Sequence, residues 1–134
     1  MSPRTLLGVL GMLIAAPAAA CGYCVEDKIA SVYDHAVVTR ALGRAHHVAF
    51  FALDGTAVRG ASVRLAVEST NGVDRGSARV SAATGMLSLA FDPRRVPFAT
   101  LEKRLQRVLA PQELTLLALR VMERPAELKN VSRR

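Results

Sequence analysis

This chain of 134 residues has only two cysteines, six aromatic residues and no tryptophan. It contains no glycine-rich phosphate loop, no zinc-protease helix motif and no G-x-S-x-G elbow. Its carboxylates form no clear acid–base pair. Asp34 stands beside His35, but neighbours on a helix point about 100° apart. These absences argue against an enzyme.

The charge is strongly of one sign, with a formal net charge of +7 at pH 7. The basic residues are mostly arginine and are scattered along the chain rather than aligned on one helix face. This scatter does not favour nucleic-acid binding. An anionic membrane surface or an acidic protein partner remains open, through the stretches 92–95, 102–107 and 130–134.

Residues 1–20 have the pattern of a secretory signal peptide. Arg4 precedes an apolar run at 6–16, and three alanines at 18–20 supply small residues for cleavage. The run is shorter than the roughly 20 residues that a membrane span needs. We therefore expect a mature chain that is periplasmic or secreted. A lipid anchor on Cys21 is disfavoured because Ala18 is small where lipoprotein signals usually carry a bulky apolar residue.

The pattern after this segment predicts an α+β fold. Apolar residues at steps of three and four predict one amphipathic helix within 21–44, with Glu26 and Asp27 in its first turn. Six further elements then follow in the order β-α-β-β-α-β, and a basic polar tail occupies 123–134. The six elements are a strand at 46–55, a helix at 60–70, two strands within 76–93 around a turn at 83–85, a helix at 97–109 and a strand at 113–122.

This order is the ferredoxin-like βαββαβ pattern, a four-stranded antiparallel sheet with two helices on one face. The first strand, "HHVAFFALDG", is apolar on both sides. We therefore expect the extra N-terminal helix to cover part of the other face.

The region 46–122 resembles the heavy-metal-associated domain of copper chaperones, metal-pumping ATPases and the periplasmic mercury-binding protein. The matching stretches are "VAFFALDG", "SVRLAVESTNGV" and "ARVSAATGMLSLAFDPRRVPFATLEKRLQRVL". The family binds soft metals at a Gly-Met-Thr-Cys-x-x-Cys loop after the first strand. Here that loop reads "LDGTAVRGAS", with Thr56 and Arg59, or Val58 and Ala61, where the cysteines belong. The family's metal ligands therefore cannot be carried over to this loop.

The cysteines stand instead in "CGYC", at Cys21 and Cys24. Cys-x-x-Cys spacing lets two thiolates reach one soft ion such as Cu(I), Hg(II) or Zn(II). His47 or His46 is a candidate further ligand, and at most one of them faces a given site because neighbouring strand residues point to opposite faces. Two other interpretations compete. Exported thiols form disulfides, and a redox pair is conceivable, although no strand precedes the motif.

We therefore predict an exported metal-binding or metal-trafficking protein, not an enzyme, with metal ligands Cys21, Cys24, His47 and His46. Its partners would be the metal ion and a protein of the cell envelope, without nucleic acid. The alternative is a metal-free module for protein or membrane contact, in which the Cys-x-x-Cys is a disulfide staple.

Overall fold

The computed structural model describes residues 20–125, with side chains described from Val25 onward. The predicted signal peptide, apart from Ala20, and most of the predicted basic tail lie outside the described residues. Within 20–125, no helix combines the length and the apolar character that crossing a membrane requires.

A four-stranded antiparallel sheet forms the centre of the domain. Its strands are β1 (His47–Asp54), β2 (Arg79–Ser81), β3 (Met86–Phe91) and β4 (Thr115–Met122), in the spatial order β2-β3-β1-β4. Helices α3 (Gly60–Glu68) and α4 (Phe98–Leu109) connect them, and a short 3-10 helix, η1 (Ala110–Gln112), leads into β4. The predicted βαββαβ order and ferredoxin-like fold are confirmed.

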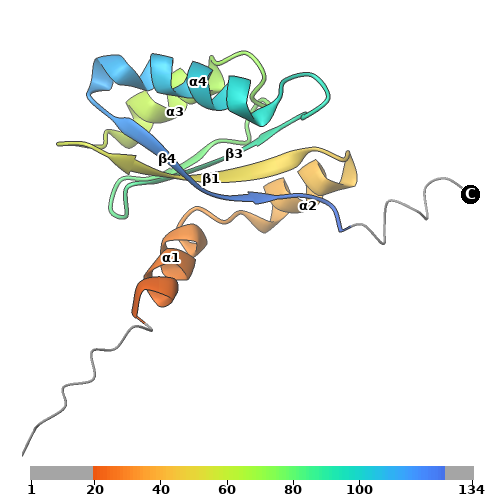
Figure 1. The fold of residues 1–134 in the computed structure, drawn as a ribbon, viewed down its shortest axis with the longest axis horizontal. Coiled ribbons are helices and arrows are strands. Elements are labelled where there is room, and N and C mark those ends of the chain that lie inside the picture. Colours follow the sequence, from red (N-terminus) through yellow and green to blue (C-terminus); the bar gives the residue numbers. More distant parts are fainter. Residues whose placement is uncertain (1–19, 126–134) are drawn as a thin grey trace, which may run out of the picture.

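Helices α3 and α4 cover one face of the sheet (Figure 1). Leu101, Leu105 and Leu109 recur every four residues along α4 and are fully buried, as are Val63 and Val67 of α3. This spacing places each set on one helix face. The predicted inward faces of both helices are therefore confirmed, and with the sheet they enclose the larger of two apolar cores.

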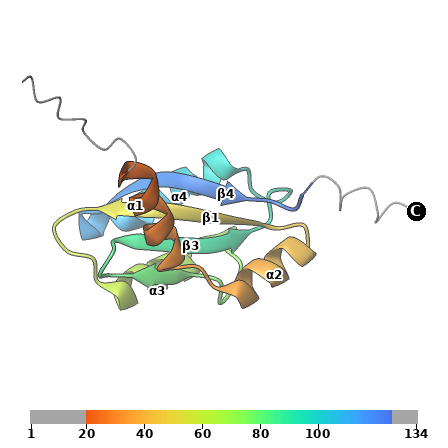
Figure 2. The ribbon, with the colours of Figure 1, turned by 90° about the horizontal axis from the view of Figure 1, so that it is seen from below.

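The opposite face is covered by two helices, α1 (Ala20–Ala30) and α2 (His35–Gly43) (Figures 1 and 2). The predicted cover of this face is confirmed, but the prediction of one continuous helix is wrong. The chain breaks because Asp34 caps α2, accepting a hydrogen bond from the Val37 N–H at 3.1 Å. Since α1 begins at Ala20, Glu26 and Asp27 do not lie in its first turn, contrary to our expectation.

The two inner strands are buried on both faces. Phe51 points into the core beneath α3 and α4, whereas its neighbour Phe50 points into the core beneath α1 and α2. All six residues of β3 are buried too, including Ser88. The apolar character of the first predicted strand on both sides therefore reflects a three-layer arrangement of helices, sheet and helices.

Candidate functional site

The CGYC motif lies at the start of α1. Cys21 and Cys24 belong to the helical backbone, and their side chains lie outside the described part of the structure. Just after the motif, Glu26 pairs with Arg120 of β4, with the Arg120 Nη1 atom 3.1 Å from Glu26 Oε2. Figure 2 shows the first half of α1 over β4 and its second half running toward β3. The motif is therefore carried on the β4 side of the sheet.

The loop between β1 and α3 corresponds to the place where the heavy-metal-associated domains that the sequence resembles hold their metal. Here a cavity of about 340 Å³ lies beside it, lined by Thr56, Ala57, Arg59, Ser62, Pro111, Gln112 and Glu113. Gly55 is required by close packing, since an added Cβ would lie 2.5 Å from the Glu113 carbonyl oxygen. None of these lining residues, all in the described part of the chain, carries a thiol, thioether or imidazole. The lining therefore offers no soft ligand, as the sequence indicated.

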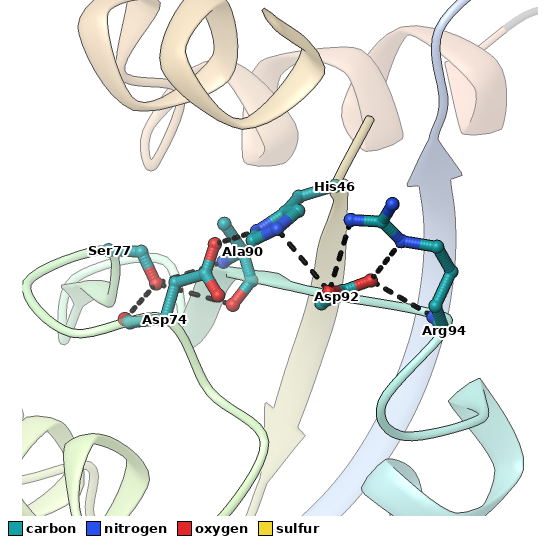
Figure 3. Close-up of polar contacts among 6 residues, drawn as sticks. All are labelled: His46, Asp74, Ser77, Ala90, Asp92 and Arg94. Atoms are coloured by element: carbon teal, nitrogen blue, oxygen red, sulfur yellow. Dashed lines mark hydrogen bonds and ion pairs between the residues drawn. The ribbon is translucent and has the colours of Figure 1, made fainter. Parts of the chain in front are cut away.

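The two candidate histidines stand at the start of β1, each with other partners. The Nδ1 atom of His46 lies 2.6 Å from Asp74 Oδ2, and its Nε2 atom lies 3.6 Å from Asp92 Oδ2 (Figure 3). His47 packs edge-on against Phe91, with ring centroids 5.7 Å apart. Its Nε2 atom lies 3.7 Å from Glu123 Oε2.

The polar cluster around His46 is built from three segments (Figure 3). The Arg94 side chain and backbone N–H donate hydrogen bonds to Asp92, and these hold the pKa of the Asp92 carboxyl below its usual range. Ser77 Oγ donates to the Asp74 carbonyl oxygen and accepts from the Ala90 N–H. The cluster thus ties the 73–77 loop and the end of β3 to the start of β1.

This cluster is a structural feature rather than a metal centre. Its imidazole lies between two carboxylates, one facing each ring nitrogen, so the three groups do not converge on one point. Among residues 25–125, whose side chains the structure describes, no group of three or more His, Cys, Asp or Glu could hold a metal ion. Sequence reasoning found His46 but missed Asp74 and Asp92. The only local signal was the Asp-Pro after β3, which indicates a turn and not its contact with His46.

The two neighbouring histidines lie at a distance from the turn of α1 that carries the cysteines. His46 and His47 lie where β1 begins, next to the end of α2, whereas α1 crosses the sheet toward the end where β1 finishes (Figure 2). Ser31, at the end of α1, confirms this placement through a 2.7 Å contact with Thr84 in the turn between β2 and β3.

No protein-family model matches this chain, and no curated protein matches it in sequence. Solved structures do match. A copper binding domain from HMA7, a P-type ATPase, is 18% identical with a TM-score of 0.46, and the match covers 56% of this chain and 96% of that domain. The NMR structure of a ZiaAN sub mutant is 26% identical with a TM-score of 0.42, covering 55% of this chain and 99% of that one.

The predicted likeness to heavy-metal-associated domains is thus found in structure as well. Copper binding is a property of the HMA7 domain. Because both TM-scores lie below 0.5, the fold assignment of this chain rests on its own strand order and helix positions.

Proposed function

We propose that this chain binds a soft metal ion through Cys21 and Cys24 and passes it to a protein partner in the cell envelope. The observation that supports the proposal is the position of CGYC in the first turn of α1. Residues three apart on a helix lie on one face, and thiols near a helix N-terminus ionise more readily. Thiolates in this arrangement suit Cu(I), Hg(II) or Zn(II).

The composition of the β1–α3 loop also supports a relocated site. A metal-carrying version of this fold would place thiols there, but Thr56 and Arg59 occupy the positions, and the cationic Arg59 would repel a metal ion. The domain would then serve as a rigid support for a motif on its N-terminal helix. We propose that export through residues 1–20 delivers it to the periplasm or the exterior, where it acts as a carrier and not as an enzyme.

His46 and His47 remain predicted helpers of weaker standing than the cysteines. The contacts of His46 with Asp74 and Asp92 give it a structural reason to be present. The two thiolates are therefore the minimal ligand set of the proposal.

The test is a metal titration of the chain beginning at Cys21, reduced beforehand. Cu(I) and Zn(II) would be titrated separately against a competing chelator. The Cys21→Ser/Cys24→Ser variant is the key comparison. Ser69→Ala, an exposed change on the far face, is the matched control. We expect tight stoichiometric binding that only the double cysteine variant loses.

A His46→Gln/His47→Gln variant measures the histidines in the same titration. A large loss of affinity would add the histidines to the ligand set. Unchanged affinity would leave the two thiolates as the only protein ligands. If the wild-type chain binds no more metal than the double cysteine variant, the proposal fails. The cysteines would then form a disulfide staple in a module for protein or membrane contact. A count of free thiols under non-reducing conditions tests this alternative, which expects none.

A further inference from the structure

The outer edge of β4 is the longest exposed strand edge of the sheet. β4 has eight residues, whereas the opposite outer strand, β2, has three. Leu117 is 60% exposed and Val121 is 38% exposed. Outer strands are commonly protected by lysine, proline, a β-bulge or a covering segment. β4 contains no lysine or proline, and its one charged side chain, Arg120, is engaged by Glu26. Its pairing with β1 shifts register once, between the Phe51–Ala118 and Phe50–Arg120 pairs, so Leu119 is an extra residue on β4.

Within residues 20–125, the cover of this edge is confined to its beginning. The Gln106 side chain of α4 accepts a hydrogen bond from the Leu116 N–H at 2.8 Å and donates one to the Leu114 carbonyl oxygen at 3.0 Å. These bonds occupy the backbone groups that an added strand would need there. Beyond Leu116, the exposed residues Ala118 and Arg120 leave the outer side of β4 facing solvent. The accessible edge is therefore residues 118–122, a stretch that includes the register shift at Leu119.

An apolar groove lies where this edge ends. It has a volume of about 410 Å³ and is lined mainly by Tyr33, Val38, Leu42, Met122 and Pro125. Met122 ends β4, so the groove continues from the accessible edge on the face that carries α1 and α2. A strand added along β4 would point every second side chain toward that face. The groove is a receptacle for one such side chain.

The charges near the β4 edge and the groove indicate which kind of segment would bind there. Arg124 rims the groove and is fixed by hydrogen bonds to the Leu42 and Gly43 carbonyl oxygens at 3.1 and 2.8 Å. Arg120 on the edge is already paired with Glu26, so the attraction rests on Arg124 and on the net charge of +7 that the chain carries. A second copy of the chain would bring the same positive charge, whereas an acidic segment would be attracted.

We propose that β4 binds an extended acidic segment of a partner protein, which adds a strand along residues 118–122 and inserts an apolar side chain into the groove. Backbone hydrogen bonds to β4 would supply affinity, and the groove and Arg124 would supply selectivity. This proposal does not depend on metal binding by Cys21 and Cys24.

The test uses the chain beginning at Cys21 and a synthetic peptide in which valines alternate with glutamates. A peptide of the same composition in scrambled order and one with lysines in place of glutamates are the comparisons. Backbone amide resonances would be followed by NMR during titration. We expect shifts centred on Ala118 to Met122 with the first peptide, and affinity at least about tenfold weaker for the other two.

Three variants locate the binding site. Val121→Glu places a like charge on the edge and should weaken peptide binding by at least about tenfold. Tyr33→Ser should weaken it less, through the groove alone. Leu65→Glu, at a 69% exposed leucine on α3, is the matched control and should leave binding unchanged. Thermal unfolding of each variant confirms that it is folded.

Several results would overturn the proposal. The first is binding without shifts in β4, and the second is equal binding of the scrambled peptide. The third is a set of β4 shifts that depends on protein concentration in the absence of peptide, which would identify a second copy as the occupant. The fourth is peptide binding that is seen only with a chain shortened to end at residue 125. That result would identify residues 126–134 of the chain itself as the occupant of the edge.

Discussion

On one face of the sheet, α3 and α4 enclose the larger apolar core, with α4 contributing a fully buried leucine at each turn. Side-chain hydrogen bonds add to this packing, since Gln106 of α4 accepts one from the Leu116 N–H. Glu68 of α3 likewise accepts one from the Ala78 N–H. On the other face, α1 and α2 cover a smaller core and are joined to the sheet by polar contacts as well. Ser88 Oγ donates to the Val32 carbonyl oxygen at 2.8 Å, and Arg79 pairs with Asp34 at 2.9 Å.

This difference indicates how the stability of the domain is distributed. Apolar burial contributes roughly 25 cal/mol per Å² and is the main favourable term in folding. The face beneath α3 and α4 should therefore set the stability of the whole domain. The α1/α2 layer has a smaller core and separate polar attachments, so it should open first. The layer that carries CGYC would then open at a lower free-energy cost than the α3/α4 layer.

The largest expected effect comes from breaking the α3/α4 side. Phe51 is fully buried, and its ring stacks against Phe98 with centroids 6.0 Å apart. We expect Phe51→Ala to lower the free energy of unfolding by about 3–5 kcal/mol, as large-to-small core changes do. Urea denaturation would measure it, with Leu65→Ala as the exposed control, expected within about 0.5 kcal/mol of wild type. A loss below about 1 kcal/mol for Phe51→Ala would refute this description of the core.

A smaller effect should come from releasing the α1/α2 layer at Ser88. Ser88→Ala removes the hydrogen bond to Val32, and we expect a loss of about 1–2 kcal/mol. The change should also be local. Amide hydrogen exchange in α1 should accelerate more than in α4, because the lost bond joins only the α1/α2 layer to the sheet. Ser62→Ala, at an exposed position on α3, is the control. Equal acceleration in both layers would show that the two faces open together.

Most of the fold could be predicted because its signals are local. The strand at 46–55 and the helix at 97–109 match β1 and α4 within about two residues, since their periodic apolar residues are those that pack. The break between α1 and α2 was missed because Val32 and Val37 continue the apolar pattern across it. Asp34 caps α2 there and bonds Arg79, 45 residues away, and that contact is a product of the fold.

The candidate site was less accessible to sequence reasoning. The sequence alone shows the spacing of Cys21 and Cys24. It also shows that Thr56 and Arg59 stand where the heavy-metal-associated domains that it resembles have cysteines. The role of His46 is not, because Asp74 and Asp92 reach it from separate loops. The exposed edge of β4 was also missed, because its apolar residues look like those of any strand until the strand order is known.

The smallest expected effect concerns charge at the junction of α1 and α2. The Val37 N–H and then Arg79 hold the pKa of the Asp34 carboxyl below its usual value. A lowered native pKa stabilises the fold fully above the unfolded value of about 3.9, and this contribution is lost as the pH falls through the native pKa. Asp34→Asn keeps an oxygen that can cap α2 but removes the charge. It should therefore be slightly less stable than wild type at neutral pH.

The difference in stability between the two proteins should narrow in acid, because the contribution of the Asp34 charge is lost as the pH falls below the unfolded pKa toward the lower native pKa. Urea denaturation between neutral pH and about pH 3 measures this narrowing, and Asp27→Asn, at an exposed position on α1, is the matched control. A gap that stays constant with pH would show that the amide fails as a cap and that the charge contributes nothing. In that case the α1/α2 layer would be held by apolar packing and neutral hydrogen bonds, and the contrast between the two faces would narrow to the size of their cores.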